Sequence, residues 1–105
     1  MDFSLSDDQQ AFVESARAFS MGVLAPNAAE WDEKSIFPKE ALAQAGELGF
    51  MGMYTPEAAG GLALSRLDAS LIVEELSKGC TATAAFLTIH NMATNMIGRY
   101  CSEAV

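Results

Sequence analysis

Few residues of this chain could do chemistry, and none has the spacing that a catalytic or metal site requires. His90 is the only histidine, and Cys80 and Cys101 are the only cysteines. These three residues match no familiar zinc pattern, and the cysteines form no CxxC pair. We expect both thiols to be free and buried, because free cysteine is among the most buried residue types. No acid or nucleophile stands at a useful distance from His90, which we interpret as a hydrogen-bonded structural residue.

Adjacent acidic residues and a glycine pair also invite a functional interpretation. Neighbours in sequence do not share a helix face, so adjacent carboxylates make poor acid–base pairs and suit solvated faces or helix starts. The acidic pairs are Asp7 with Asp8, Asp32 with Glu33, and Glu74 with Glu75. Gly60 and Gly61 lack the strand and helix of a phosphate-binding loop and predict a turn. We therefore assign no catalytic, cofactor-binding or metal-binding residue to this chain.

Composition limits the class of protein and its partners. The chain has 105 residues, of which 50% are hydrophobic, so it forms one small domain at most and is not disordered. Six basic against 14 acidic residues give a net charge of −8, which repels nucleic acid and anionic lipid. The first residues carry no basic or Arg-rich targeting pattern. We expect a cytoplasmic protein, or a mitochondrial matrix protein if a transit peptide has been removed.

The first half of the chain predicts three helices. Ser6 and Gln9 form a capping box before apolar residues at helical spacing. Pro26 predicts a break or restart of this helix, with a short second helix over residues 27–33. Pro38 suits the first position of a third helix, which Gly49 ends. Its apolar stripe is Ala41, Leu42, Ala45 and Leu48.

The second half predicts an ordered loop over residues 50–64 and two further helices. Ser65 caps a helix that runs to Lys78, and Gly79 is expected to end it in a left-handed conformation. We predict that Leu67, Leu71, Ile72 and Leu76 are its buried stripe, and that Asp68, Glu74, Glu75 and Lys78 face water. Thr81 is expected to cap the last helix, which ends near Tyr100. Successive helices without alternating strands indicate an all-α helical bundle.

The last helix has no charged residue between Lys78 and Arg99, which requires an explanation in so acidic a chain. Its many threonine, asparagine and histidine side chains argue against a membrane span. At 100° per residue it has two faces. We predict that the apolar face packs on this domain and that the polar face is buried against another domain, a subunit or a ligand. The alternative is an exposed helix that simply lacks charge. The apolar face holds Ala85, Phe86, Ile89, Met92, Ala93, Met96 and Ile97, and the polar face holds Thr83, Thr88, His90, Asn91, Thr94 and Asn95, interleaved with Ala84 and Leu87.

An ordered set of short motifs resembles the N-terminal helical domain of flavin-dependent acyl-CoA dehydrogenases, over nearly the whole chain. The motifs are Leu24-Ala25-Pro26, Ala29-Glu30-Trp31-Asp32, Phe37-Pro38, Leu48-Gly49-Phe50, Tyr54-Thr55-Pro56-Glu57, Gly60-Gly61-Leu62, Leu64-Ser65 and Glu74-Glu75-Leu76. Three stretches are most similar to the isobutyryl-CoA branch of that family, which handles short branched acyl groups: Leu64-Ser65-Arg66-Leu67-Asp68, Gly79-Cys80-Thr81 and Ile89-His90-Asn91-Met92. Ala63 departs from the pattern, because the family often has glycine there.

The resemblance implies that residues 1–105 form an incomplete N-terminal helical domain, with a middle β domain and a C-terminal helical domain absent. In that family a glutamate of the C-terminal domain removes the α-proton of the acyl thioester, and the β-hydrogen leaves as hydride to the flavin of FAD. Electrons then pass to an electron-transfer flavoprotein, and the enzymes are typically homotetramers of fatty acid and branched-chain amino acid catabolism. The resemblance thus implies a parent oxidoreductase, while this chain alone would lack the base and the flavin and be inactive.

The same resemblance maps the acyl-pocket wall onto Ala84, Thr88 and Met92, one helical turn apart. None of the three is ionisable, which suits selection of acyl groups by shape. A stand-alone helical protein-interaction module without enzymatic activity is the alternative function, because it too would explain an uncharged last helix. Only the dehydrogenase explains the ordered motifs.

Overall fold

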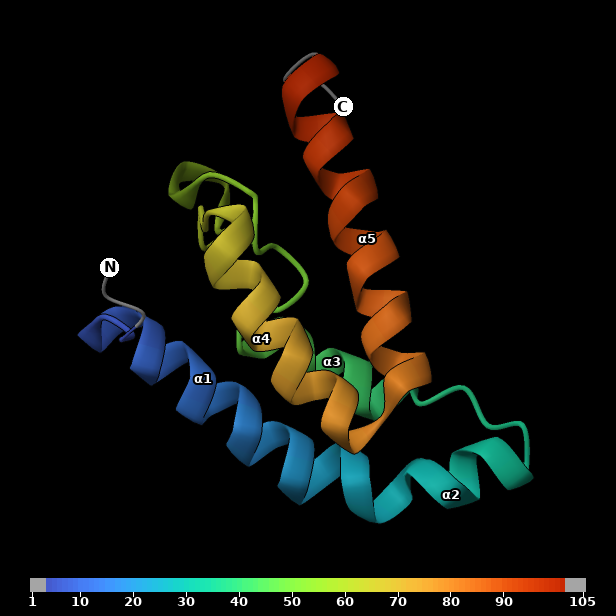
Figure 1. Cartoon of the computed structure of the whole chain (residues 1–105). Coiled ribbons are helices and arrows are strands. Elements are labelled where there is room, and N and C mark those ends of the chain that lie inside the picture. The colour runs from blue at the N-terminus through green and yellow to red at the C-terminus, as the bar shows by residue number, and fades with distance from the viewer. Residues whose placement is uncertain (1–3, 102–105) are drawn as a thin grey trace.

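The computed structural model describes residues 4–101, which are helical and contain no strand. This confirms the predicted all-α class. The helices are α1 (Asp7–Phe19), α2 (Ala25–Glu33), α3 (Lys39–Glu47), α4 (Arg66–Gly79) and α5 (Thr81–Tyr100). A π-helical turn (Ser20–Leu24) joins α1 to α2, and a short 3₁₀ turn (Glu57–Ala59) lies in the long loop. In Figure 1, α1 and α4 converge toward their C-terminal ends, and α4 and α5 open from one another like the arms of a V.

The predicted capping box begins α1 as expected. The Ser6 side chain accepts a hydrogen bond from the Gln9 backbone N–H at 3.1 Å, and the Gln9 side chain accepts one from the Ser6 N–H at 2.9 Å. The helical path is not broken at Pro26. It widens into the π-helical turn, and Pro26 then falls in the first turn of α2, where a missing N–H costs little.

The C-terminal end of α4 corrects one prediction. Gly79 remains inside the helix, and Cys80 follows it in an extended conformation, so no left-handed cap forms. Gly79 is needed for a different reason. A Cβ atom there would lie 2.7 Å from the Ser20 carbonyl oxygen and 3.0 Å from the Leu24 Cβ. The glycine therefore permits close contact between α4 and the π-helical turn.

Two residues of α4 lie on the opposite side from the one predicted. Leu67 is 63% exposed, whereas Glu75 is only 5% exposed. The cause is tertiary, because α1 brings Arg17 to Glu75. Arg17 Nη2 lies 3.1 Å from Glu75 Oε1, and Lys78 Nζ lies 3.1 Å from the same atom. A second link between the two helices joins Gln9 Nε2 to Asp68 Oδ1 at 2.8 Å.

Residues 50–64 form the predicted ordered loop. Hydrogen bonds between its own backbone groups hold it together. The Leu62 N–H donates to the Gly52 carbonyl at 2.9 Å, and the Leu64 N–H donates to the Met53 carbonyl at 2.7 Å. Ala63 has a φ of 52° in this loop. Glycine adopts that left-handed conformation more easily than alanine does, which gives a physical reason for a glycine at this position.

The side of α5 that packs on the domain is the reverse of the prediction. Thr83, Ala84, Leu87 and Asn91 are all at most 5% exposed and lie against the core. The apolar residues that we expected to be buried are instead exposed by 40–62%: Phe86, Ile89, Met92, Met96 and Ile97. The helix itself begins at Thr81, with Cys80 in the cap position, and ends at Tyr100. The helix was therefore predicted correctly, and its orientation was not.

The expected burial of the two thiols is also wrong in part. Both cysteines are free, as predicted, but Cys80 is only half-buried and Cys101 is exposed. Of the helices in residues 4–101, none combines the length and the apolar character that crossing a membrane requires.

Candidate functional site

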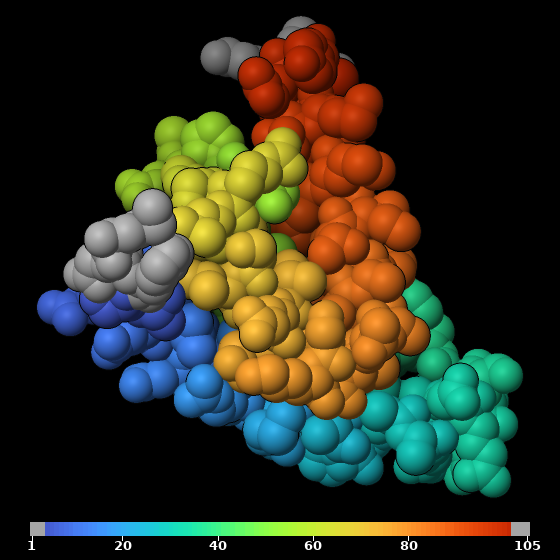
Figure 2. All heavy atoms as spheres, viewed as in Figure 1, coloured from blue at the N-terminus to red at the C-terminus, as the bar shows by residue number. Residues whose placement is uncertain are grey.

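A hollow of about 280 Å³ lies between the long loop, α4 and α5. Figure 2 shows it between the yellow start of α4 and the orange-red α5, with the green loop beneath. Three segments line it: Met53 and Tyr54 of the loop, Arg66 and Val73 of α4, and Thr88, Ile89, Asn91 and Met92 of α5. Most of these side chains are apolar, so the hollow suits a small apolar group rather than a charged one.

The structure brings two of the three predicted pocket residues together. Thr88 and Met92 lie one turn apart on α5 and both line the hollow. Thr88 Oγ1 donates to the Ala85 carbonyl at 2.7 Å, so its hydroxyl is already paired within the helix. Ala84 lies one turn earlier and is 2% exposed, in the core beneath α5. Contact of these three residues with a substrate stays a prediction.

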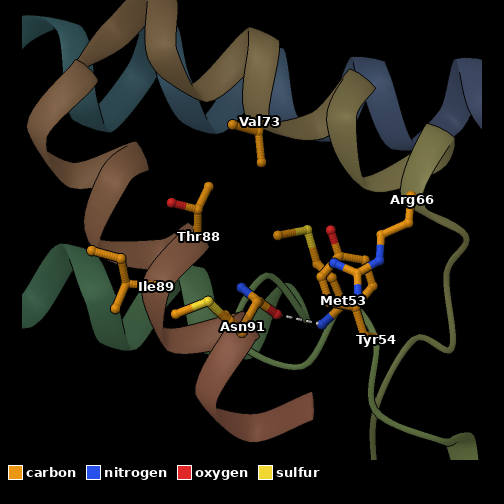
Figure 3. A pocket seen from close by; sticks show the side chains of 8 residues that line it. Met53, Tyr54, Arg66, Val73, Thr88, Ile89 and Asn91 are labelled. Atoms are coloured by element: carbon orange, nitrogen blue, oxygen red, sulfur yellow. Dashed lines mark hydrogen bonds between the residues drawn. The ribbon is translucent and has the colours of Figure 1, made fainter. Parts of the chain in front are cut away.

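Asn91 is the most connected side chain of the hollow. Its Oδ1 accepts from the Met53 N–H at 2.8 Å, and its Nδ2 donates to the Phe50 carbonyl at 2.8 Å and to the Leu87 carbonyl at 2.7 Å. Figure 3 shows the amide directed from α5 toward the backbone of the loop. We predicted that Asn91 would be buried against a partner, but this domain's own loop buries it. An amide suits this place because it both donates and accepts.

Arg66 is the only charged residue among those that line the hollow. Its guanidinium carbon lies 4.4 Å from the centre of the Tyr54 ring, a cation–π arrangement that is visible in Figure 3. Arg66 is exposed and begins α4, so this contact joins the start of the helix to the loop at the rim of the hollow.

A buried carboxylate, Glu75, links α4 to Arg17 of α1. Hydrogen bonds from Arg17 lower the pKa of Glu75, burial opposes this by raising it, and Lys78 lowers it further. The same contact raises the pKa of Arg17. Glu75 is therefore ionised at neutral pH. It does not line the hollow, and its contacts join α4 to α1.

An exposed apolar surface runs along α5 and shares Ile89 and Met92 with the rim of the hollow. The Phe37 and Phe86 rings meet edge to face with centroids 5.4 Å apart, and Phe37 is 57% exposed. From there the apolar surface follows α5 through Ile89, Met92 and Met96. We call these five residues the outer apolar face. An exposed apolar surface of this kind is typical of a face that a further domain or partner covers.

Comparison with known proteins identifies the family. The model of the acyl-CoA dehydrogenase N-terminal domain matches residues 6–105. The chain belongs to this family. It is 46% identical over 99 residues to the mitochondrial isobutyryl-CoA dehydrogenase of Bos taurus and 42% identical to that of Dictyostelium discoideum. Each match covers 94% of this chain and 24% of the relative, so the chain spans about a quarter of the length of these proteins.

Two further similarities widen the range of chemistry among the relatives. An acryloyl-CoA reductase (NADH) of Anaerotignum propionicum is 36% identical over 95% of this chain and 25% of its own length. A solved structure described as an electron transferring flavoprotein of Acidaminococcus fermentans aligns with a TM-score of 0.78 and 31% identity. That alignment covers 93% of this acyl-CoA dehydrogenase domain and 30% of the solved chain.

Within this acyl-CoA dehydrogenase domain, residues 4–101 hold no group of three or more His, Cys, Asp and Glu side chains that could bind a metal ion. His90 is half-buried on α5 and does not line the hollow. Sequence reasoning located Thr88 and Met92 but missed the opposite wall, Met53 and Tyr54. The glycines around that loop signalled only a turn, and nothing in the sequence pairs residues 50–54 with α5.

Proposed function

We propose that this domain is part of a longer flavin-dependent dehydrogenase that forms an α,β double bond in a short, branched acyl-CoA such as isobutyryl-CoA. The observation that carries the proposal is the 46% identity to a bovine isobutyryl-CoA dehydrogenase across 94% of the chain. The whole enzyme would hold the catalytic base and the redox cofactor, because this chain spans about a quarter of such a protein.

The domain would contribute part of the acyl-pocket wall. Thr88 and Met92 line an apolar hollow of about 280 Å³, and Ala84 lies beneath them. A small residue at position 84 lets α5 pack closely on the core and so supports the position of Thr88. Nothing in this trio is ionisable, so it would select acyl groups by shape and leave proton transfer to other residues.

The redox cofactor of the whole enzyme would be FAD, which does not fit the hollow of this chain. The hollow is smaller than the pockets that enclose drug-sized ligands, and FAD is larger than such ligands. Gly60 and Gly61 belong to the turn that closes the long loop instead of cradling a phosphate. We propose that the residues that bind the flavin lie outside this chain.

For the whole enzyme we propose acyl-CoA as substrate, an electron-transfer flavoprotein as electron acceptor and a homotetramer as its assembly. The cytoplasm or the mitochondrial matrix would be its compartment, the latter in view of the mitochondrial relatives. The isolated chain would be inactive as a dehydrogenase. Oxidation in fatty acid or branched-chain amino acid catabolism is the corresponding physiological role.

A stand-alone interaction module is the second candidate, and the outer apolar face favours it, because such a face also suits a protein partner. Absorbance separates the two. The polypeptide that contains this domain should be purified and its visible absorption spectrum recorded, because bound flavin absorbs visible light. Bound flavin together with oxidation of isobutyryl-CoA supports the dehydrogenase. A protein with neither is the outcome that favours the module.

A substitution at Thr88 tests the role of the wall. In the same polypeptide, Thr88→Trp should fill the hollow and lower kcat/KM for isobutyryl-CoA by about 10-fold or more relative to straight-chain acyl-CoA, the range that one misfitting group causes. Thr81→Trp, at the exposed start of α5, is the matched control. An unchanged ranking of substrates in the Thr88 variant would refute the pocket assignment.

A further inference from the structure

Asn91 connects the two walls of the hollow. The side chain is 1% exposed, and it joins α5 to the loop through the Met53 N–H and the Phe50 carbonyl. On the same helix, Thr88 and Met92 flank it and line the hollow. One amide therefore holds the loop at a set distance from the helix that forms the opposite wall.

We infer that Asn91 is a positioning residue that fixes the width of the acyl pocket and thereby the preference for short acyl groups, an inference that rests on the proposed function. The residues that it positions are Met53 and Tyr54, which line the hollow opposite α5, with the Tyr54 ring against Arg66 (Figure 3). Asn91 itself need not touch the substrate, because its polar atoms already bind the backbone.

Within residues 4–101, the hydrogen bonds that join this loop to α5 are those of Asn91, whereas Leu62 and Leu64 close the loop on itself. Gly49 and Gly52 flank Phe50 and Met51, and glycines give the backbone freedom on both sides. The Phe50 N–H donates to the Ala45 carbonyl, which fixes the start of the loop to α3. The Met53 N–H and the Phe50 carbonyl have Asn91 as their partner, and buried backbone groups without a partner are costly.

The side-chain chemistry at position 91 is specific. Asparagine supplies an acceptor for Met53 and donors for Phe50 and Leu87 from one planar group. Leucine has a similar size but supplies neither. An ionised aspartate keeps the acceptor and loses the donors. Asn91→Leu therefore removes both contacts to the loop, and Asn91→Asp removes the contact to the Phe50 carbonyl. Neither substitution adds bulk.

The inference is tested by Asn91→Leu and Asn91→Asp in the polypeptide that contains this domain. We would measure kcat and KM with isobutyryl-CoA, butyryl-CoA and hexanoyl-CoA, and amide hydrogen exchange at Met53. The expected result is faster exchange at Met53, a KM for isobutyryl-CoA raised about 10-fold, a kcat within about threefold, and a lower preference for isobutyryl-CoA over hexanoyl-CoA. The aspartate variant should show at least as large a change, because it buries a carboxylate against the Phe50 and Leu87 carbonyl oxygens.

Asn95→Leu is the matched control, because Asn95 lies one turn further along α5 and does not line this hollow. It should leave the substrate preference unchanged. If Asn91→Leu does not fold, Asn91→Ser, which is smaller and keeps a polar group, carries the same comparison. Variants that exchange faster at Met53 but keep the original preference overturn the inference alone. An unmodified protein that oxidises no acyl-CoA overturns the proposed function instead.

Discussion

The two sides of α5 differ in a way that reverses the usual rule for an amphipathic helix. The inner side carries Thr83 and Asn91, two polar residues that are at most 5% exposed. The outer side carries Ile89, Met92 and Met96, which are 54–62% exposed. The difference teaches that apolar character alone did not select the side that packs on this domain. The inner side has small residues and an amide with partners, and the outer side is exposed in this domain.

The largest expected effect is a difference in the free energy of unfolding between alanine substitutions on the two sides of α5. Leu87→Ala removes a side chain that is fully buried on the inner side and should lower the free energy of unfolding by about 2–5 kcal/mol. Ile89→Ala removes a side chain that is 62% exposed and should change it by no more than about 0.5 kcal/mol. Urea unfolding of the 105-residue chain measures both. Equal losses would contradict the orientation of α5.

The next prediction concerns self-association of the chain through the outer side of α5. We expect the 105-residue chain to self-associate through the outer apolar face, as apolar patches without a partner do. Sedimentation at two concentrations should show a rise in mean mass with concentration. Ile89→Glu combined with Met96→Glu should abolish that rise, because it places charge on the exposed surface. A strict monomer at high concentration would show that the outer side needs no cover.

The same reversal occurs on α4, where Glu75 is buried and Leu67 is exposed. The pH dependence of stability tests the role of Glu75. Because Arg17 lowers the folded-state pKa of Glu75 below its ordinary value of 4.5, the ionised carboxylate stabilises the fold above that pH. This contribution is lost as pH falls through the lowered pKa. Glu75→Gln should therefore destabilise the chain at pH 7, and the difference should shrink as pH falls below 4.5 and disappear below the lowered pKa of Glu75. Thermal unfolding between neutral and acidic pH measures it.

Glu74→Gln is the matched control, because Glu74 precedes Glu75 on α4 but is exposed and has no resolved contact with Arg17 or Lys78. It should leave the pH dependence unchanged. A Glu75 variant whose stability falls in parallel with that of the unmodified chain over the whole pH range would show that the ion pair does not hold α4 on α1.

The smallest effect is expected in the loop, where residue type and backbone conformation disagree. Ala63 has a φ of 52°, and Ala63→Gly should raise the free energy of unfolding by roughly 0.5–1 kcal/mol, because relief of the left-handed strain exceeds the added freedom of the unfolded chain. Ala59→Gly is a suitable comparison, since Ala59 lies in the 3₁₀ turn without a positive φ. A loss of stability in both variants would contradict the strain at Ala63.

Local signals predicted the helices well. Ser6 with Gln9 and Ser65 with Asp68 placed the starts of α1 and α4, because an N-cap depends only on residues within one turn. The family was also identified from the ordered motifs. For the candidate site, the sequence placed Thr88 and Met92 on one helix but not Met53 and Tyr54 across from them. Contacts between residues 38 positions apart, such as that of Met53 with Asn91, leave no local pattern.

The sequence by itself therefore determined the all-α class, the capped helices, the ordered loop and membership of the acyl-CoA dehydrogenase family. Only the tertiary structure decided which side of α5 is buried, why Gly79 must be a glycine, and which partner Glu75 has. The physical reason is that helix formation depends on neighbours along the chain, whereas the orientation of a helix depends on the surfaces that meet it. Asn91 is polar and yet buried because the loop presents a backbone N–H and a carbonyl to it.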